Sequence, residues 1–420
     1  MAYTVTKTTG YGQRVSNSFK GIFSGILLFI IGTILLFWNE GRFVKTQKAL
    51  QEAEGAVVSV ESVAKVDPDL NGQLIHATGM TATEDTLADA DFGISVVAIS
   101  LKREVEYFQY VENTETETKD KLGGSEETTT TYTYSTRWVG GPVDSAGFKA
   151  PDAPKNKALT KLDDLRQTAT NVTFGAYTLP DFLISKISGS VPVEITLTDE
   201  QKAEWSKKLS VLGETNAVTA VAAAVAGETT AESAGEAVAT AVVAPNMVHV
   251  NGNVVYFGKD PNNAQVGDLR VTFTKVMPGQ VSIIAKVKGS TFAKYGKKNF
   301  AFLSMGEKSA EEMFDAEHAA NSMLTWILRI VGLLLVVGGL KGIFGILTTL
   351  AKVVPFIASI IGAGIGLICW VLGGAWSLLI IALAWLTYRP IIGIPLLILA
   401  VGGLVFLKMA ASKNKAQTSE

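Results

Sequence analysis

The distribution of apolar segments along the chain most constrains how it can fold. One apolar segment, Gly21–Trp38, lies near the N-terminus, about 280 mostly polar residues follow, and an almost unbroken apolar block runs from Met323 to Leu407. A run of about 18 or more apolar residues is long enough to cross a bilayer as a helix. The sequence therefore predicts an integral membrane protein in which one large water-facing domain connects two membrane parts.

Composition narrows the classes of function. Apolar residues make up 48% of the 420-residue chain, which is above the norm for soluble proteins. The formal net charge of −2 provides no basic field for a nucleic acid, so we expect no nucleic-acid partner. The only cysteine, Cys369, lies in an apolar segment, and one thiol builds neither a disulfide framework nor a thiolate metal site.

The first apolar segment has the features of a membrane anchor rather than of a cleaved signal peptide. About 20 mostly polar residues precede it, and it ends in Leu36-Phe37-Trp38-Asn39-Glu40 instead of a small-residue cleavage site. Positive charges are balanced around this segment, but Lys408, Lys413 and Lys415 follow the last apolar segment. Positive residues favour the cytoplasmic side. An even number of spans then predicts both termini in the cytoplasm and the large domain outside.

We expect an α+β membrane protein with four spans, one before and three after a β-rich extracytoplasmic domain. In chain order the expected parts are a cytoplasmic N-terminus (1–20), a first span (21–38), the extracytoplasmic domain (39–320), a second span (321–340), an intramembrane or interfacial segment (341–364), a third span (365–388), a fourth span (391–407) and a cytoplasmic tail (408–420). If the segment 341–364 crossed the membrane, five spans would place the C-terminal lysines outside, which the charge bias disfavours. The sequence leaves open whether this segment re-enters the membrane or lies on it.

The large domain has patterns typical of β-hairpins. Arg103–Glu112 and Thr128–Val139 are rich in β-branched and aromatic residues, and an acidic loop, Asn113–Glu127, joins them. Asn251-Gly252 predicts a tight turn in a second hairpin, because this pair suits a type I′ turn.

Two further patterns precede the second span. Leu269–Val276 and Val281–Lys288 are predicted to form a third hairpin around Pro278-Gly279. Helical signals appear at Thr198–Leu212 and at a capping box, Ser309–Glu312, which starts a helix leading into the second span. An Ala-rich insertion over 216–243 is either a helix pair or a mobile segment.

Catalytic and metal-binding patterns do not stand out. The three histidines, His76, His249 and His318, lack the spacing of metal ligands, and no phosphate-binding glycine loop or nucleophile–base motif is present. We therefore predict no catalytic residue, no metal site and no cofactor, and a protein that is not an enzyme. The acidic loop could bind a cation, but a solvated hairpin tip is the more common role for such a loop.

Charged residues near the membrane are the more informative candidates. Under the four-span arrangement Glu40, Arg329 and Arg389 all approach the outer face, where ionisable groups are costly unless they pair or reach the headgroups. We predict that Glu40 pairs with Arg329 or Arg389 and fixes the first span to the C-terminal bundle. The alternative is that each side chain simply reaches the headgroups. The candidate interaction residues are Glu40, Arg42, Arg329, Tyr388, Arg389 and Pro390.

Small residues are the other signal within the apolar segments. Glycines allow helices to approach closely, and they occur here as Gly21, Gly25, Gly338, Gly339, Gly362 and Gly366. Either they form contacts between copies of the chain, or they reflect the usual glycine content of membrane helices.

Several short motifs, in their order and spacing, resemble the transmembrane protein 43 (LUMA) family along nearly the whole chain. They are Asn39–Arg42, Asn71–His76, Leu101–Glu112, Tyr132–Trp138, Val266–Phe273, Ala310–Phe314, Asn321–Arg329 and Trp385–Pro390. The Ala-rich stretch around 216–243 departs from the family pattern, so the resemblance implies no role for it. The composition suggests a bacterial member.

The resemblance implies four spans, cytosolic termini, a luminal or periplasmic domain and no catalytic residues. It also implies self-association and the scaffolding of other membrane proteins. In animal cells the family is placed at the endoplasmic reticulum and inner nuclear membrane, with emerin and the lamina as partners. A bacterial member has no nuclear envelope, so the expected partners are membrane lipids, further copies of the chain and other membrane proteins, at the inner membrane. The competing function is a channel or transporter component, which the few polar residues of the C-terminal spans disfavour.

Overall fold

A computed structural model of the protein describes residues 2–206, 208–209, 247–353, 355–391, 393–395 and 398. Its helices are α1 (Tyr11–Ala56), α2 (Asp181–Ile184), α4 (Ala310–Ala351) and α5 (Pro355–Tyr388), with single 3-10 turns at Pro68–Leu70 and Ser145–Gly147. Residues 199–206 are helical as well. Among the described residues, α1, α4 and the 360–388 part of α5 are long and apolar enough to cross a membrane. Together with two large sheets, they confirm an α+β membrane protein.

The helices that contain the apolar segments extend well beyond them. The second span was expected to end at Leu340, but α4 continues to Ala351, because no proline occurs between Leu340 and Pro355. Proline is well accommodated in the first turn of a helix, and α5 begins there. In secondary structure the predicted segment 341–364 is divided between α4 and α5, and its placement in or on the membrane stays a prediction. The Ala-rich insertion, most of the predicted fourth span and the C-terminal tail lie outside the described residues, so the count of four spans stays a prediction.

Most of the water-facing part forms two sheets. In the eight-stranded sheet the order is β1 (Ala2–Thr9), β7 (Glu126–Val139), β6 (Ser100–Asp120), β14 (Leu269–Val276), β13 (Val254–Phe257) and β12 (Val248–Asn251), with β8 (Leu165–Thr168) on β6 and β11 (Ser190–Pro192) on β14. The seven-stranded sheet has the order β17 (Phe302–Met305), β15 (Gln280–Lys288), β16 (Thr291–Ala293), β10 (Tyr177–Thr178), β9 (Val172–Phe174), β3 (Leu74–Thr83) and β2 (Val57–Val60), and β15 also pairs with β3. A separate pair is formed by β4 (Thr86–Asp89) and β5 (Ile94–Val97).

Two of the predicted hairpins had different outcomes. The Asn251-Gly252 turn joins β12 to β13 as predicted, and Gly252 has a φ of 59°, in the left-handed region that favours glycine. The predicted pairing of Leu269–Val276 with Val281–Lys288 is wrong. Both segments are strands, but β14 lies in the eight-stranded sheet and β15 in the other, so Pro278-Gly279 carries the chain from one sheet to the next.

A hydrophobic cluster fixes the helices to the seven-stranded sheet. Leu50 and Ala53 near the end of α1 and Phe314 near the start of α4 are buried against Ile284 of β15 and Phe302 of β17. The capping box predicted at the start of α4 is present: the Ser309 hydroxyl accepts from the Glu312 N–H and the Glu312 carboxylate accepts from the Ser309 N–H. This burial makes the water-facing ends of α1 and α4 one body with the sheet.

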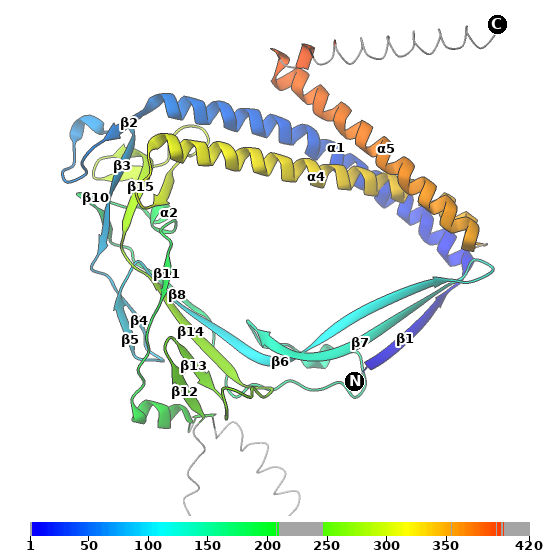
Figure 1. The fold of residues 1–420 in the computed structure, drawn as a ribbon, viewed down its shortest axis with the longest axis horizontal. Coiled ribbons are helices and arrows are strands. Elements are labelled where there is room, and N and C mark those ends of the chain that lie inside the picture. Colours follow the sequence, from blue (N-terminus) through cyan, green and yellow to red (C-terminus); the bar gives the residue numbers. More distant parts are fainter. Residues whose placement is uncertain are drawn as a thin grey trace, which may run out of the picture.

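Most of the residues predicted to form the acidic loop Asn113–Glu127 lie instead in the strands of a long polar arm. We use "arm" for β1, β7 and the outer half of β6, which pair antiparallel and leave only Lys121–Ser125 as a loop. Alternating threonines favour strand structure because they are β-branched. The helices lie along one side of the molecule and the arm along the other, and they meet where β1 leads into α1 (Figure 1).

The arm is fastened to the helices by a set of charges that we call the clamp: Arg14, Asp120, Glu126 and Lys352. The Arg14 side chain is buried, and its Nη2 lies 2.7 Å from Asp120 Oδ1 and 3.0 Å from Glu126 Oε2. Lys352 Nζ, just after α4, lies 3.4 Å from the same Asp120 oxygen. Gly123 N–H also donates to the Val353 carbonyl oxygen at 3.2 Å. The start of α1, the tip of the arm and the α4–α5 turn therefore meet at one point.

The pairing of β1 with β7 bears on the orientation expected from the sequence. That orientation separates residues 1–20 from the domain by a membrane, but Thr4 lies opposite Thr131 in a continuous eight-residue ladder. We expect single cysteines at Thr4 and at the exposed Leu122, in a Cys369→Ala background, to react equally with a membrane-impermeant maleimide in sealed cells. A third single-cysteine variant, at Lys161, shows on which side of the membrane the two sheets lie. Labelling of Thr4 and Leu122 from opposite sides would contradict the ladder.

Candidate functional site: a polar lock among the apolar helices

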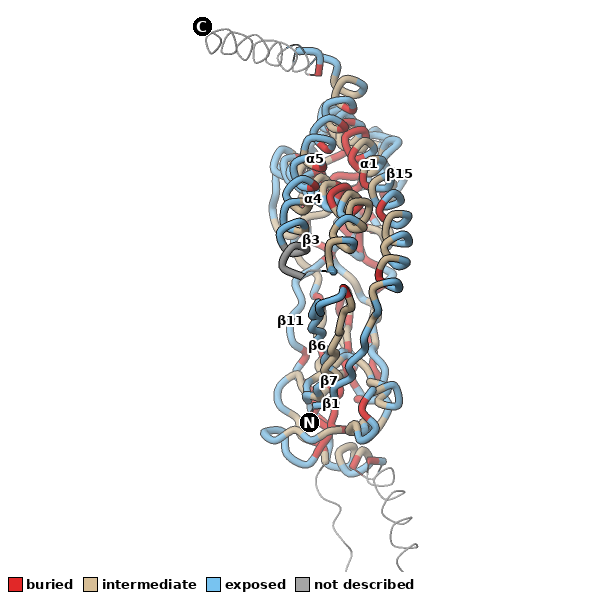
Figure 2. The backbone as a smooth tube through the Cα atoms, turned by 90° about the vertical axis from the view of Figure 1, so that its right-hand side faces the viewer, coloured by how far each residue is buried: buried red, intermediate tan, exposed pale blue. Residues whose placement is uncertain are grey.

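The helices α1 and α4 run antiparallel at very short range because glycines face each other between them. Gly25 lies so close to α4 that an added Cβ would be 2.6 Å from the Gly339 carbonyl oxygen. Gly32 and Gly332 occupy a second close approach, against Leu335 and Leu36 respectively. Buried residues gather where α1, α4 and α5 face one another (Figure 2). At Gly25 and Gly339, two of the six glycines singled out in the sequence, the close contact is within one chain.

The centre of the site is Glu40, whose side chain is 1% exposed. Arg329 of α4 donates to both of its oxygens, from Nε to Oε1 at 2.7 Å and from Nη2 to Oε2 at 2.8 Å. Trp385 of α5 donates from Nε1 to Oε2 at 2.8 Å. The Arg329 guanidinium also lies 4.8 Å from the ring centre of Trp326. One carboxylate therefore joins all three helices by charge-assisted hydrogen bonds.

A second set of hydrogen bonds is formed by the residues of α1 on either side of Glu40, Asn39 and Arg42. Arg42 donates from Nη1 to Asn321 Oδ1 at 2.9 Å and from Nη2 to Thr325 Oγ1 at 2.7 Å. Asn39 donates from Nδ2 to the Thr325 carbonyl oxygen at 3.0 Å, and Asn321 donates to the Phe43 carbonyl oxygen. We call the whole set the polar lock; its members are Asn39, Glu40, Arg42, Asn321, Thr325, Arg329 and Trp385.

The remaining predicted candidates lie beside the lock at the end of α5. Tyr388 fits against Gly41, where an added Cβ would be 2.6 Å from the tyrosine ring. The Arg389 guanidinium lies 4.7 Å from the Phe43 ring centre rather than at Glu40. Pro390 follows the end of α5. Of the two partners predicted for Glu40, the geometry therefore selects Arg329.

Sequence reasoning missed four lock residues, namely Asn39, Asn321, Thr325 and Trp385. Each had a recognisable signal, because polar or indole N–H groups within an apolar helix need hydrogen-bond partners. Asn321 and Thr325 are one helical turn apart and so share a face of α4. Pairing the polar faces of the three helices would have brought these residues together with Glu40 and Arg42.

The histidines are separated from one another and from the lock. His76 Nε2 lies 2.8 Å from the Lys308 carbonyl oxygen, and His318 Nε2 lies 3.5 Å from Glu54. His249 lies beside Tyr256 in the eight-stranded sheet. Within the part of the chain that the structure describes, no three histidine, cysteine or acidic residues form a group able to hold a metal ion. The polar lock therefore joins the three helices and buries the Glu40 charge, rather than providing an open site for a metal ion.

Comparison with known proteins gives a consistent result. The family model described as Transmembrane protein 43 matches residues 107–390. The Transmembrane protein 43 of Rattus norvegicus is 28% identical over 91% of this chain and 88% of its own length, and that of Homo sapiens is 27% identical over 97% and 92%. A Transmembrane protein 43 homolog of Drosophila melanogaster is 27% identical over 89% of this chain and 90% of its own. No solved structure matches the chain.

Proposed function

Because the chain belongs to the transmembrane protein 43 family, we propose that it is a non-enzymatic, multi-pass membrane scaffold that self-associates and organises membrane proteins or lipids. The observation that carries this proposal is the polar lock. It ties α1, α4 and α5 together at the point where α1 and α4 extend beyond their apolar parts toward the sheets. A displacement of the helices in the bilayer is thereby transmitted to the water-facing sheets as a rigid-body movement, which suits a protein that responds to membrane stress.

The outer faces of the helices support a role within the membrane. Large apolar side chains are exposed along all three helices, among them Phe23, Ile34, Trp326, Leu367 and Leu378. Contiguous exposed apolar surface of this kind marks contact with lipid or with other membrane proteins. Further copies of the chain and other membrane proteins are the partners we propose for it.

For the location we propose the inner membrane of a bacterium, with the sheets in the periplasm and the C-terminal tail in the cytoplasm. The support for this orientation is the excess of lysines after the last apolar segment. For residues 2–9 the pairing of β1 with β7 is the better guide, because positive charges around the first span are balanced. We therefore place residues 2–9 in the same compartment as the tip of the arm, with which they pair.

A pore component is the second candidate, and one observation favours it. The arm carries threonine and glutamate along residues 113–118 of β6 and threonine along residues 128–131 of β7, and its tip reaches the far ends of α1 and α4. Polar strands cannot face lipid, because their free edges would leave backbone groups unpaired. If the helices cross a bilayer, the arm beside them requires a water-filled or protein-lined space, such as the centre of a ring of copies.

Native mass spectrometry of the full chain in lipid nanodiscs tests the scaffold proposal. We expect a defined homo-oligomer that retains lipid, and we expect the oligomer to weaken in the Glu40→Gln variant as the helices lose their common anchor. A monomer without bound protein would overturn self-association. A ring-like copy number, followed by ion flux in liposomes, would favour the pore instead.

A further inference from the structure

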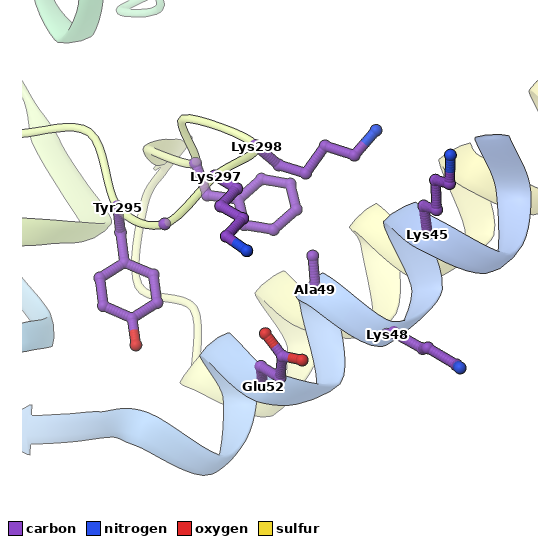
Figure 3. A pocket seen from close by; sticks show the side chains of 9 residues that line it. Lys45, Lys48, Ala49, Glu52, Tyr295, Lys297 and Lys298 are labelled. Atoms are coloured by element: carbon purple, nitrogen blue, oxygen red, sulfur yellow. The ribbon is translucent and has the colours of Figure 1, made fainter.

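A cavity of about 500 Å³ lies between α1 and the loop that follows β16. Lysines from both sides line it: Lys45 and Lys48 from α1, and Lys297 and Lys298 from the loop. Lys297, Lys298 and Lys45 border the space between loop and helix, whereas Lys48 points away along the helix (Figure 3). Of the described residues that line it, Glu52 alone is acidic. The cavity therefore has a strongly positive rim.

The loop lysines are held in place by local structure. Tyr295 and Phe300 form an antiparallel bridge with N–H···O distances of 2.7 and 2.8 Å, and the Asn299 N–H donates to the Gly296 carbonyl oxygen. Asn299 adopts a φ of 56°, which asparagine tolerates better than most residues. Phe300 packs on Phe302 with ring centres 5.4 Å apart. The turn therefore presents two adjacent lysines from the same hydrophobic cluster that holds α1.

These cations are available for a ligand. All four lysines are exposed, and within the described part of the chain none of them forms an ion pair. Among the residues that the structure describes, their one charge-dependent contact is that of Lys45 with the Tyr388 ring, 5.9 Å from its centre. Like charges brought together without partners repel, so a site of this kind gains most from an anion that neutralises several of them.

The position of the cavity identifies the anion. The apolar part of α1 ends at Trp38, and tryptophan marks the membrane–water interface. Lys45 lies seven residues beyond it, a rise of roughly 10 Å along a helix, which is just outside the headgroup layer and within reach of it for the long lysine side chain. Arg389, in a neighbouring cavity that shares Lys48, extends the positive surface around α1 at the same level.

We propose that this cavity binds the phosphate headgroup of an anionic membrane phospholipid. Lys297 and Lys298 contact the phosphate from the loop and Lys45 contacts it from the helix, and the glycerol end points past Lys45 toward Trp38 and the bilayer. The proposal rests on the proposed function only in placing the apolar helices in a bilayer. It adds a lipid class and a binding site that are independent of self-association.

The test uses the full chain in a neutral detergent, with dioleoyl phosphatidylglycerol as the anionic lipid and dioleoyl phosphatidylcholine as the comparison. Bound lipid is counted by native mass spectrometry across a titration. We expect preferential retention of phosphatidylglycerol, and a loss of apparent affinity of about 30-fold in the Lys297→Gln/Lys298→Gln variant, the effect of removing two cations near a membrane surface. The Lys161→Gln/Lys259→Gln variant removes the same charge from exposed positions beside the eight-stranded sheet and should bind as the parent does.

Three outcomes would overturn the proposal: equal retention of the two lipids, unchanged affinity in the loop variant, or equal loss in the control variant. Glycerol phosphate provides a further arm, because displacement of the lipid by this soluble headgroup at similar concentration would assign the site to a free phosphate. The oligomer mass is read from the same spectra. Loss of lipid selectivity with the oligomer intact would reject only the lipid site. A monomer that still prefers phosphatidylglycerol would reject only the self-associating scaffold.

Discussion

Replacing Gly339 with alanine is expected to lower the free energy of unfolding by about 3 kcal/mol, whereas the same change at the neighbouring Gly338 should raise it slightly. A Cβ at Gly339 would lie 2.6 Å from the Phe29 nitrogen and 2.7 Å from the Gly25 carbonyl oxygen, both of them backbone atoms that cannot move aside. Overpacking of this kind typically costs about 1–3 kcal/mol, and more where backbone must shift. A Cβ at Gly338 meets nothing within 4 Å. There alanine gains its higher helix propensity, roughly 1 kcal/mol.

The measurement is thermal unfolding of the two variants and the parent in one detergent. Gly25→Ala provides a second test from the other helix, because its Cβ would lie 2.6 Å from the Gly339 carbonyl oxygen. We expect Gly25→Ala and Gly339→Ala to melt well below the parent and Gly338→Ala at or above it. Equal melting of all three variants would show that α1 and α4 do not approach as closely as described.

Breaking the ion pair at the centre of the polar lock should have an effect of comparable size. Glu40→Gln and Arg329→Gln each leave one charge without its partner, and Glu40 is the more deeply buried of the two. Removal of one member of a buried ion pair costs about 3–5 kcal/mol. The double variant removes both charges, so we expect it to lose less stability than the sum of the single variants. Trp385→Phe should cost about 1 kcal/mol, the usual net value of one hydrogen bond.

The protein contains a matched control for this double-mutant cycle. Arg270 and Glu106 form a pair with the same two-point geometry, and the Arg270 guanidinium lies 4.6 Å from the Trp138 ring centre. Its side chains are 39% and 34% exposed, against 17% and 1% for Arg329 and Glu40. An ion pair open to water contributes about 0–1 kcal/mol. Strictly additive losses at Glu40 and Arg329, or equal losses at the two pairs, would refute the lock as a buried anchor.

Much of this arrangement follows from the sequence by local rules. Hydropathy locates the three apolar helices, and the cost of ionisable groups near lipid narrows the partner of Glu40 to Arg329 or Arg389. The Asn251-Gly252 turn and the Ser309 capping box are equally local, since each depends on residues within one turn of the chain. Such features can be predicted because their partners lie nearby or are few in number.

The remaining features depend on contacts between distant residues. The acidic residues and glycines of Asn113–Glu127 are typical of a solvated loop, whereas its alternating threonines favour a strand. The pairing of β6 with β7, and of β7 with β1 more than 100 residues away, decides for the strand. Pro278-Gly279 has the composition of a hairpin turn, yet the strands on either side, β14 and β15, pair with strands of two different sheets. In both cases local propensity allows two structures, and long-range burial decides between them.

The clamp has a consequence for biosynthesis. Its four members come from positions 14, 120, 126 and 352, so the ring of contacts through the arm and the helices closes only after the start of α5 has emerged from the ribosome. β1 has no partner until β7, more than 100 residues later in the chain, has been made, and an unpaired strand edge is a template for wrong pairing. The first residues to be synthesised are therefore fixed in two steps, first by β7 and then by closure of the clamp at Lys352, and a nascent chain of this protein needs protection of β1 until β7 follows.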